Sequence, residues 1–271
     1  MLKLRYLDMW LPLLKAVLIV GLLLCGVLIV ITIMPVLLNV PGGRKSALLA
    51  QQICSSWRKT ACRILNIHTH ITGTPCPSAG LVVANHVSWL DIIAIGAQQP
   101  MVFIAKQEVS EWPIMGFLAA NIGTLFVSRG DGAETRRTAE KMIWELRAGK
   151  RLMLFPEGTT TRGDQVLRFH ARLFHPAQQA QVQVQAVSVH YSGAAKEVAP
   201  FVGDDAFVPH LLRVIQLRRI DLHLHYCTPL SPVQERNRLA QTARAQIMDV
   251  LHMGEAMKKA GNYSAYPLER K

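Results

Sequence analysis

The chain has 271 residues, of which 50% are hydrophobic, a proportion that supplies a buried core and excludes disorder for most of the chain. Its formal net charge of +12 predicts an anionic partner. The candidates are nucleic acid, anionic lipid headgroups and a phosphorylated substrate, and charge alone does not choose among them. The five cysteines form no CxxC pair and are odd in number, so the sequence predicts neither a zinc module nor a disulfide framework. Two HxH pairs, His68/His70 and His223/His225, lack nearby Cys or carboxylate partners and predict half-exposed strand faces rather than a metal site.

A long apolar segment lies near the N-terminus. Residues 17–38 carry no charge, and at about 1.5 Å per residue a helix of this length reaches about 33 Å, enough to cross the hydrocarbon core of a bilayer. The segment is too long for a secretory signal peptide, and no small-residue cleavage site follows it cleanly. We therefore expect residues 1–45 to form a membrane anchor.

Two arrangements of this anchor are open. Basic residues flank the apolar segment on both sides, so the positive-inside rule does not fix its orientation. Gly21, Gly26 and Pro35 offer places for a bend. We expect either one spanning helix or a helical hairpin that leaves both ends on the same side of the membrane.

Beyond the anchor, short β-rich runs alternate with helical stretches, a pattern typical of an α/β domain. We expect this domain to occupy residues 46–253 and to be followed by a polar tail at 254–271. A helix that begins at Ser231 and Pro232 is predicted to close the domain. The other predicted elements are helices at 47–65 and 133–148, the second ending at Gly149, and strands at 81–84, 101–105, 124–128, 151–155, 182–191 and 220–226.

Polar clusters follow three of the predicted strands, at the point where each strand ends. Asn85 and His86 follow the first strand, Arg129 follows the third, and residues 157–159 follow the fourth. Ligands of open α/β sheets bind beyond the carboxyl ends of the strands. If these strands run parallel, the three clusters lie at one edge of the sheet and form one site.

The first cluster contains a histidine and a carboxylate that suit acid–base chemistry. His86 has a near-neutral ordinary pKa, and Asp91 is placed to hold its non-reacting ring nitrogen. Five residues of regular helix turn through about 500°, which sets two side chains about 140° apart. His86 must therefore precede the helix, with Asp91 in or near its first turn, a position that the helix dipole also favours for a carboxylate.

These residues resemble the motifs of a known family. NHVSWLD at residues 85–91 resembles the NHxxxxD motif of the glycerolipid acyltransferases, GTLFVSR at 123–129 resembles their second block, and FPEGTT at 155–160 resembles their third. The order and separation of the blocks also agree with bacterial lysophosphatidic acid acyltransferases. Residues 184–189 correspond to the fourth block but lack its proline, so no residue is assigned there. The resemblance implies an α/β fold with a mixed, mainly parallel sheet flanked by helices, preceded by a membrane helix or hairpin.

The resemblance implies transfer of a fatty acyl group to the free hydroxyl of a lysophospholipid. The acceptor would be 1-acyl-sn-glycerol-3-phosphate, giving phosphatidic acid, and the donor would be acyl-CoA or acyl carrier protein. His86 would act as general base and Asp91 would orient it, without an acyl-enzyme. No cofactor and no metal is expected. The enzyme would lie at the inner membrane of a bacterium, with its catalytic domain on the cytoplasmic face.

The same resemblance assigns substrate-binding residues. Arg129 would bind the acceptor's phosphate, unless it is a surface arginine in a salt bridge. Glu157 would contact the acceptor's glycerol or hydroxyl groups, unless it only ends a helix, and Gly158 would allow close backbone approach. The complete assigned set is Asn85, Gly123, Phe126, Arg129, Phe155, Pro156, Glu157, Gly158 and Thr159.

Two other functions remain open. Residues 202–210 resemble a segment of lyso-ornithine lipid acyltransferases, whose acceptor has a carboxylate in place of the phosphate that Arg129 would bind. A non-catalytic, membrane-tethered binder of anionic lipid or nucleic acid is the third reading. The basic residues are scattered and form no known nucleic-acid module, so no nucleic acid is expected as a partner.

Overall fold

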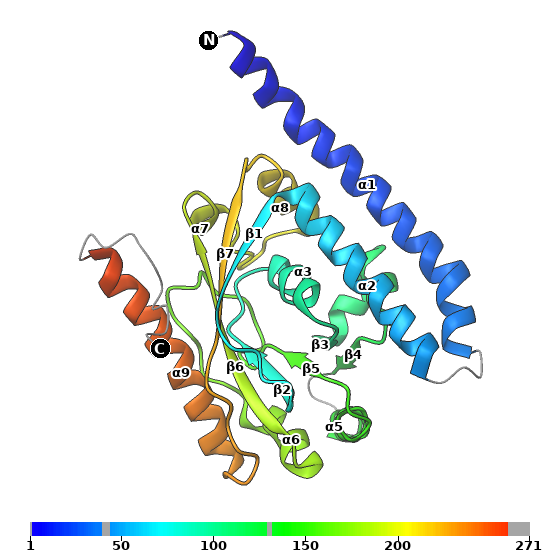
Figure 1. Cartoon of the computed structure of the whole chain (residues 1–271), viewed down its shortest axis with the longest axis vertical. Helices are drawn as coiled ribbons and strands as arrows, with labels where there is room; N and C mark the ends of the chain where they lie inside the picture. The colour runs from blue at the N-terminus through cyan, green and yellow to red at the C-terminus, as the bar shows by residue number, and fades with distance from the viewer. Residues whose placement is uncertain (1, 40–43, 129–131, 260–271) are drawn as a thin grey trace.

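The computed structural model describes residues 2–39, 44–128 and 132–259. Helices cover both faces of one central sheet, and the long helix α1 runs beside the domain and extends beyond it (Figure 1). The helices are α1 (Leu2–Asn39), α2 (Arg44–Leu65), α3 (Trp89–Gln98), η1 (Gln107–Glu111), α4 (Met115–Asn121), α5 (Gly132–Arg147), η2 (Ala171–Phe174), α6 (His175–Ala180), α7 (Ala195–Val198), α8 (Phe207–Val214) and α9 (Arg236–Lys259). The strands are β1 (Ile67–Gly73), β2 (Ala79–Ala84), β3 (Val102–Lys106), β4 (Leu125–Val127), β5 (Leu152–Leu154), β6 (Gln183–Ser192) and β7 (Ile220–Tyr226).

The sheet is mixed and mainly parallel, as the sequence predicts. Its strand order is β1-β7-β6-β2-β5-β3-β4. Only the β6–β7 pair is antiparallel among the described strands, whereas β2 through β6 all run in the same direction. The carboxyl ends of β2, β4 and β5 therefore meet at one edge, which confirms the condition on which the predicted site depends.

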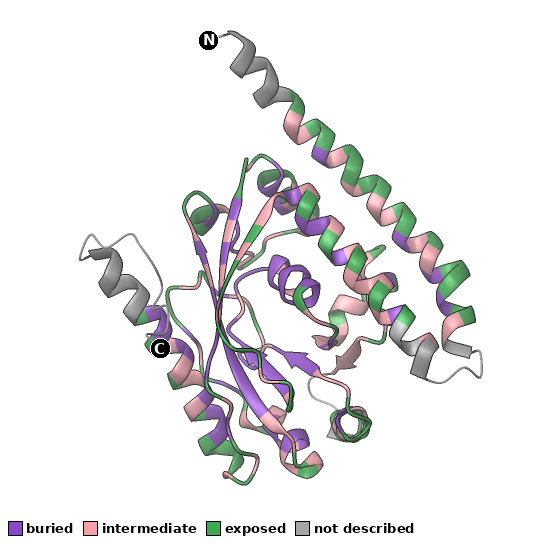
Figure 2. Ribbon diagram, in the orientation of Figure 1, coloured by how far each residue is buried: buried purple, intermediate pink, exposed green. Residues whose placement is uncertain are grey.

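Alternating side chains of the central strands enter two separate hydrophobic cores. On β2, Leu81 and Val83 pack in the core formed with α5, α6 and α9, whereas Val82 and Ala84 pack in the core formed with α3 and α8. Buried residues accordingly concentrate in the middle of the sheet (Figure 2). A strand covered on both faces needs an unbroken apolar run, and this requirement explains the sequence LVVA at 81–84.

The apolar N-terminal segment forms one continuous helix, α1, which packs against α2 and does not turn back on itself. Residues 10–37 of α1 are long and apolar enough to cross a membrane. Helix α1 continues through Gly21, Gly26 and Pro35, so the alternative of a helical hairpin with a bend at these positions was wrong. Gly26 serves close packing instead, since a Cβ there would lie 2.9 Å from Nε1 of Trp57 on α2. Lys15 fixes the other end of α1 to the domain by donating a hydrogen bond of 2.6 Å to the carbonyl of Leu217.

Several elements differ from the sequence-based expectation. The bounds of strand β1 were not predicted because the strand has no apolar run, although His68 and His70 are exposed on it, as expected for a half-exposed strand face. The helices α4, α6, α7 and α8 were not predicted either. Helix α9 begins at Arg236, not at Ser231, because the Ser231 hydroxyl accepts a bond from the amide of Val233 within a preceding turn. The same helix continues to Lys259, so residues 254–259 of the expected tail are helical.

Candidate active site

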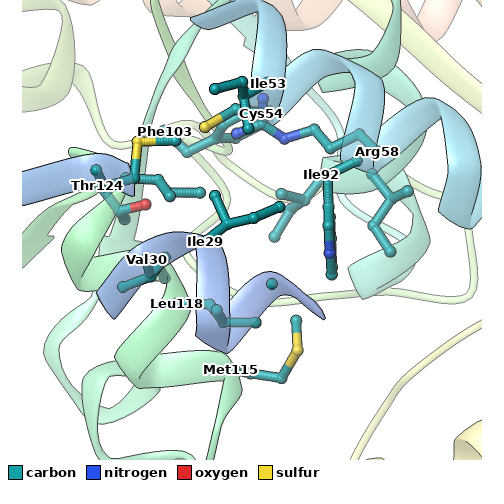
Figure 3. Close-up of a pocket in the computed structure, with 16 residues that line it drawn as sticks. Ile29, Val30, Ile53, Cys54, Arg58, Ile92, Phe103, Met115, Leu118 and Thr124 are labelled. Atoms are coloured by element: carbon teal, nitrogen blue, oxygen red, sulfur yellow. The ribbon is translucent and has the colours of Figure 1, made fainter. Parts of the chain in front are cut away.

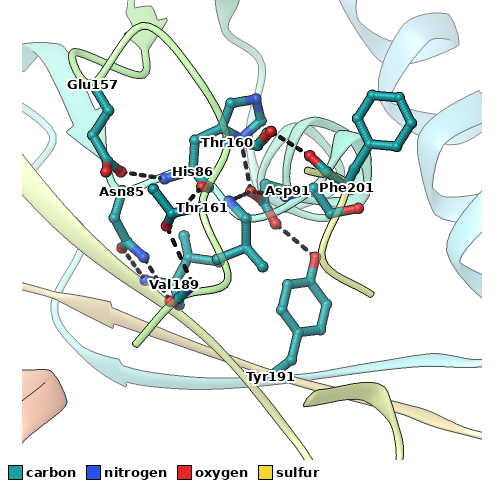
Figure 4. A network of polar contacts seen from close by, with 12 residues as sticks. Asn85, His86, Asp91, Glu157, Thr160, Thr161, Val189, Tyr191 and Phe201 are labelled. Atoms are coloured by element: carbon teal, nitrogen blue, oxygen red, sulfur yellow. Dashed lines mark hydrogen bonds and ion pairs between the residues drawn. The ribbon is translucent and has the colours of Figure 1, made fainter. Parts of the chain in front are cut away.

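His86 and Asp91 form the predicted pair at the start of α3. Ser88 stands at the N-cap of this helix, so His86 precedes it and Asp91 lies in its first turn, as the spacing requires. His86 Nδ1 lies 2.8 Å from Asp91 Oδ2 (Figure 4). Because the carboxylate accepts, Nδ1 carries the proton and Nε2 is left with a lone pair. The His86 side chain is 16% exposed, which gives an acceptor hydroxyl access to the ring.

Asp91 is a fully buried carboxylate held by several donors. Its Oδ2 also accepts hydrogen bonds from the backbone amides of Val87 at 2.8 Å and Ser88 at 2.9 Å. Its Oδ1 accepts a hydrogen bond of 2.6 Å from the hydroxyl of Tyr191 on β6. Burial and the charge of Asp91 raise the pKa of Tyr191 well above its usual value, so the phenol keeps its proton and remains a donor. These bonds compensate the burial of a charge next to His86.

Glu157 fixes the backbone on either side of the site. Its Oε1 accepts from the amide of His86 at 2.8 Å, and its Oε2 accepts from the amide of Leu167 at 2.7 Å. The carbonyl of His86 in turn accepts from the amide of Thr161 at 2.8 Å. Burial raises the pKa of Glu157, although both amide bonds act in the opposite direction. Both carboxylate oxygens of Glu157 are thus engaged by backbone amides inside the protein.

Asn85 joins two strands of the sheet. Its amide nitrogen donates to the carbonyl of Val189 at 2.9 Å, and its amide oxygen accepts from the backbone amide of Val189 at 2.8 Å (Figure 4). The Asn85 side chain is fully buried. These two hydrogen bonds fix the end of β2 against β6 directly before His86, so Asn85 positions the catalytic segment from inside the fold.

Comparison with known proteins assigns the family. Residues 67–190, which contain His86, Asp91 and Glu157, match the family model described as Acyltransferase. Over 200 residues the chain is 38% identical to the lyso-ornithine lipid O-acyltransferase of Pseudomonas aeruginosa, covering 73% of this chain and 77% of that protein. The chain belongs to this acyltransferase family.

Two further similarities agree with this assignment. The 1-acyl-sn-glycerol-3-phosphate acyltransferase of Neisseria meningitidis is 33% identical over 166 residues, covering 60% of this chain and 65% of that protein. The crystal structure of the 1-acyl-sn-glycerophosphate acyltransferase from Thermotoga maritima matches with a TM-score of 0.67 at 20% identity, over 98% of this chain and 100% of that chain. The latter similarity establishes a common fold. This acyltransferase is therefore an O-acyltransferase of the 1-acyl-sn-glycerol-3-phosphate acyltransferase type.

The third block of the acyltransferase, residues 155–160, supports His86 through a ring contact and through the conformation of its loop. Phe155 stacks on the His86 ring with a centroid distance of 3.8 Å and an interplanar angle of 12°. Pro156 is buried, and its carbonyl accepts from the amide of His170 at 2.9 Å. Gly158 has a positive φ of 69°, which favours glycine, while Thr159 is exposed beside the site.

The second block lies on the edge strand β4, at the same end of the sheet. Gly123 precedes β4 with a positive φ of 88°, and the carbonyl of Phe126 accepts from the hydroxyl of Thr138 on α5 at 3.2 Å. Arg129, the predicted phosphate ligand, lies outside the described residues. The structure therefore brings the first and third blocks into direct contact and sets the described part of the second block at the same sheet edge.

Two supporting residues lie outside the three acyltransferase blocks, although His210 ends the segment 202–210 that the sequence comparison singled out. Tyr191 lies on the predicted strand 182–191, and the two-residue period places it on the same face as Val187 and Val189, toward α3. His210 on α8 accepts from Nε1 of Trp89 at 2.9 Å, and its other ring nitrogen lies 3.1 Å from the carbonyl of Pro200. Strand alternation alone predicts that Tyr191 is buried, but it does not predict the hydrogen bond from Tyr191 to Asp91.

Proposed function

We propose that this acyltransferase moves a fatty acyl group from a thioester, on CoA or acyl carrier protein, to the free hydroxyl of a lysolipid. The observation that carries the proposal is the His86–Asp91 pair, whose Nδ1 is bonded at 2.8 Å while Nε2 has no hydrogen-bond partner among the described residues. An accessible imidazole with its second nitrogen held by a carboxylate is the arrangement that general-base catalysis needs.

The reaction uses the chain's own groups at each step. His86 Nε2 removes the proton from the acceptor hydroxyl as its oxygen attacks the thioester carbonyl. Asp91 stabilises the imidazolium that forms, and the thiolate leaves as the carbonyl reforms. The imidazolium then returns its proton to the departing sulfur, so His86 regains its starting state. The products are an ester and a free thiol.

The acceptor follows from the relatives as a further part of the proposal. Both named activities use an amphiphile with a single acyl chain, and the higher identity and coverage belong to the lyso-ornithine lipid enzyme. We therefore favour lyso-ornithine lipid as acceptor, with 1-acyl-sn-glycerol-3-phosphate as the second candidate. The guanidinium of Arg129 suits either headgroup, because its fork binds carboxylates and phosphates alike.

The membrane is part of the same proposal. The apolar surface of α1 carries large exposed side chains along residues 10–37, including Trp10, Leu14, Val17 and Leu28. Such a surface is stable in lipid and unstable in water. We infer that the domain works at the inner membrane of a bacterium on the cytoplasmic face, where acyl-CoA and acyl carrier protein occur, and that the lysolipid reaches His86 from the bilayer.

The test offers the purified protein labelled acyl-CoA or acyl carrier protein, each with lyso-ornithine lipid and with 1-acyl-sn-glycerol-3-phosphate. We expect labelled diacyl product with at least one pair, and a loss of turnover by about 10² or more in His86→Ala, the range for removal of a general base. His252→Ala, at an exposed position on α9, is the matched control and should retain full turnover. Unchanged acyl transfer in His86→Ala would contradict the mechanism. Lipid binding by the wild-type protein without any acyl transfer would instead support the non-catalytic, membrane-tethered binder.

A further inference from the structure

The edge strand β1 has one side without hydrogen-bond partners. It stands at the end of the sheet beside β7, and α2 and β1 run apart from the point at which they join (Figure 1). The carbonyl of Asn66 accepts from the amide of Ile220 on β7, and the backbone groups of successive strand residues point to opposite sides. Residues 66, 68, 70 and 72 therefore face β7. No described residue bonds to the N–H and C=O groups that point away from the sheet, which belong to Ile67, Thr69, Ile71 and Gly73.

The side chains of β1 do not cover this edge. The ring of His70 stacks on that of His223 with centroids 4.6 Å apart, and His70 Nε2 lies 2.8 Å from Oδ1 of Asp221. Both partners belong to β7, so the His70 ring is held over the sheet and away from its outer edge. The edge is therefore open to solvent, in agreement with the 43% exposure of Ile71.

Helix α1 also leaves the edge uncovered. It packs mainly against α2 and α4, and an apolar cavity lies between these helices and the sheet (Figure 3). Residues of α1, α2, α3, β3 and α4 line this cavity, and its described lining includes no residue of β1. The apolar anchor and the open edge are thus separate surfaces of the protein.

Strand β1 lacks the features that keep edge strands from pairing. Natural edges are protected by short length, by Lys or Pro, or by a β-bulge. Strand β1 has seven residues, IHTHITG, with no Lys, Arg, Asp, Glu or Pro, and its register with β7 is unbroken. The opposite edge strand, β4, has only three residues, and the carbonyl of its Phe126 accepts from Thr138 on α5. An unprotected edge of seven residues is a template for another strand.

The outward groups of β1 are complementary to themselves. In an antiparallel pairing centred on His70, Thr69 lies opposite Ile71 of a second copy and Ile67 lies opposite its Gly73, so all the outward residues obtain partners. A slide of two residues in either direction leaves Ile67 or Gly73 without one. The chain carries a formal charge of +12, but β1 carries no formal charge, so two copies meet along this strand without like charges opposite one another.

We propose that β1 is the interface of a homodimer, in which the β1 strands of two copies pair antiparallel about a twofold axis at His70. The pairing is isologous and joins the two seven-stranded sheets into one continuous sheet. At the axis the two His70 residues form a non-hydrogen-bonded pair, with Cα atoms about 4.5 Å apart. His68 lies opposite Thr72 of the second copy, so the two His68 residues are about 14 Å apart along the strands.

Cysteine cross-linking tests this register in the full-length protein. A disulfide needs Cα atoms about 4.4–6.8 Å apart, so His70→Cys should form a disulfide between copies on mild oxidation. His68→Cys is the matched control, because the same residue type stands exposed on the same face of β1. Both are made with Cys25 and Cys76, which are not buried, replaced by Ser. We expect a covalent dimer as the main product of His70→Cys and only a trace from His68→Cys, and equal yields or no dimer from His70→Cys would overturn the proposal.

Charge variants test the same pairs without oxidation. Thr69→Lys/Ile71→Lys sets lysine against lysine across the axis, and it should raise the dimer dissociation constant at least about tenfold, measured by sedimentation of the detergent-solubilised protein. Thr69→Glu/Ile71→Glu should weaken the dimer in the same way. An equal mixture of the two variants sets Lys against Glu and should restore the dimer as a heterodimer. Ser231→Lys/Val233→Lys, at exposed positions with the same spacing, is the control and should dimerise like wild type.

These measurements report mass and cross-links, so they do not depend on acyl transfer. The Tm of each variant shows whether it is folded, and the cross-linking arm stands even if a charge variant does not fold. A wild type that remains monomeric at every protein concentration would overturn the proposal and leave the β1 edge to an extended segment of another protein. A mixture of the Lys and Glu variants that forms no heterodimer would overturn the pairing of Thr69 with Ile71.

Discussion

Tyr191 donates a hydrogen bond of 2.6 Å to Asp91 Oδ1, while His86 is bonded to Oδ2 of the same carboxylate. The two bonds hold Asp91 from opposite oxygens, so the plane of the carboxylate is fixed, and with it the plane of the imidazole. The strand β6 thereby reaches the catalytic pair through a residue 100 positions away from Asp91 in the chain. Tyr191 does not bond to His86 in the described structure and acts on it through Asp91.

Replacement of Tyr191 by Phe tests this relationship. The variant keeps the buried ring and removes the donor to Asp91, so we expect a folded protein with kcat lowered about tenfold by a less well oriented His86. The variant leaves Asp91 Oδ1 without its donor, so the effect should appear in kcat, with little change in the KM of the acceptor. Tyr226→Phe, a buried tyrosine on β7, should leave kcat unchanged, and an unchanged kcat in Tyr191→Phe would limit Tyr191 to packing.

Replacement of Asp91 by Asn separates charge from shape. The amide can still accept from the amides of Val87 and Ser88, so the start of α3 should remain folded and Tm should change little. The imidazolium of His86 loses its counter-charge, and we expect kcat to fall by about 10² to 10⁴. Measured kcat and Tm of this variant, beside those of the exposed Asp164→Asn, distinguish the two effects. Full activity in Asp91→Asn would exclude electrostatic support by this residue.

Glu157 offers a choice between contact with the acceptor and support of the backbone. Its two oxygens accept from the amides of His86 and Leu167, so Glu157→Gln sets an NH₂ against one backbone N–H. We expect a loss of about 1–3 kcal/mol in unfolding free energy and a lower kcat, with little change in the acceptor's KM. Exposed Glu111→Gln is the control. A raised acceptor KM at unchanged stability would instead support the substrate contact that the sequence motif implies.

The location of the site was predictable because it depends on strand order and short spacing. Parallel strands end at one edge, so residues after β2 and β5 meet there, and the five-residue separation of His86 and Asp91 requires a turn before α3. Both conclusions follow from backbone geometry, which local sequence specifies. The prediction that the HxH pairs lie on half-exposed strand faces also agrees with the structure, where the rings of His70 and His223 stack with centroids 4.6 Å apart.

Contacts made through the buried backbone were not predictable. Asn85 and Glu157 belong to motifs that suggest ligand contact, but their polar atoms bond to the backbone of Val189, His86 and Leu167. Such bonds depend on which loop packs against which strand, and no local pattern records this arrangement. The alternative of a helical hairpin with a bend at Gly26 was wrong for the same reason, since the glycine is required by Trp57 on another helix.

Arg129 lies outside the described residues, so the prediction for this residue rests on the sequence alone. The described strand β4 of its block ends at the same sheet edge as His86, and a guanidinium is suited to the anionic headgroup of the acceptor. Arg129→Ala should therefore raise the KM of the acceptor more than the KM of the donor. Steady-state kinetics with each substrate varied in turn measure the two values. The reverse order would assign this arginine to the donor, and Arg136→Ala, exposed on α5, serves as a nearby control.

His210 predicts a dependence of stability on pH. Burial first, and then the charge of Arg213, lower the pKa of His210 from its ordinary 6.5. Its Nδ1 accepts from Trp89, so a proton on that nitrogen would oppose the Trp89 N–H. Below about pH 6.5 the unfolded chain binds a proton at this histidine that the folded chain resists, and unfolding becomes more favourable as the pH falls.

The contribution of His210 is therefore fully present above pH 6.5 and is lost progressively toward the lowered pKa of the folded state. Other groups titrate in the same range, so the measurement is the difference in Tm between wild type and His210→Asn at pH 8, 7, 6 and 5. We expect wild type to be the more stable protein at pH 8 and this advantage to shrink at pH 6 and 5. A difference that stays constant across the four values would mean that His210 does not resist protonation, and that its bonds to Trp89 and Pro200 stabilise α8 independently of charge.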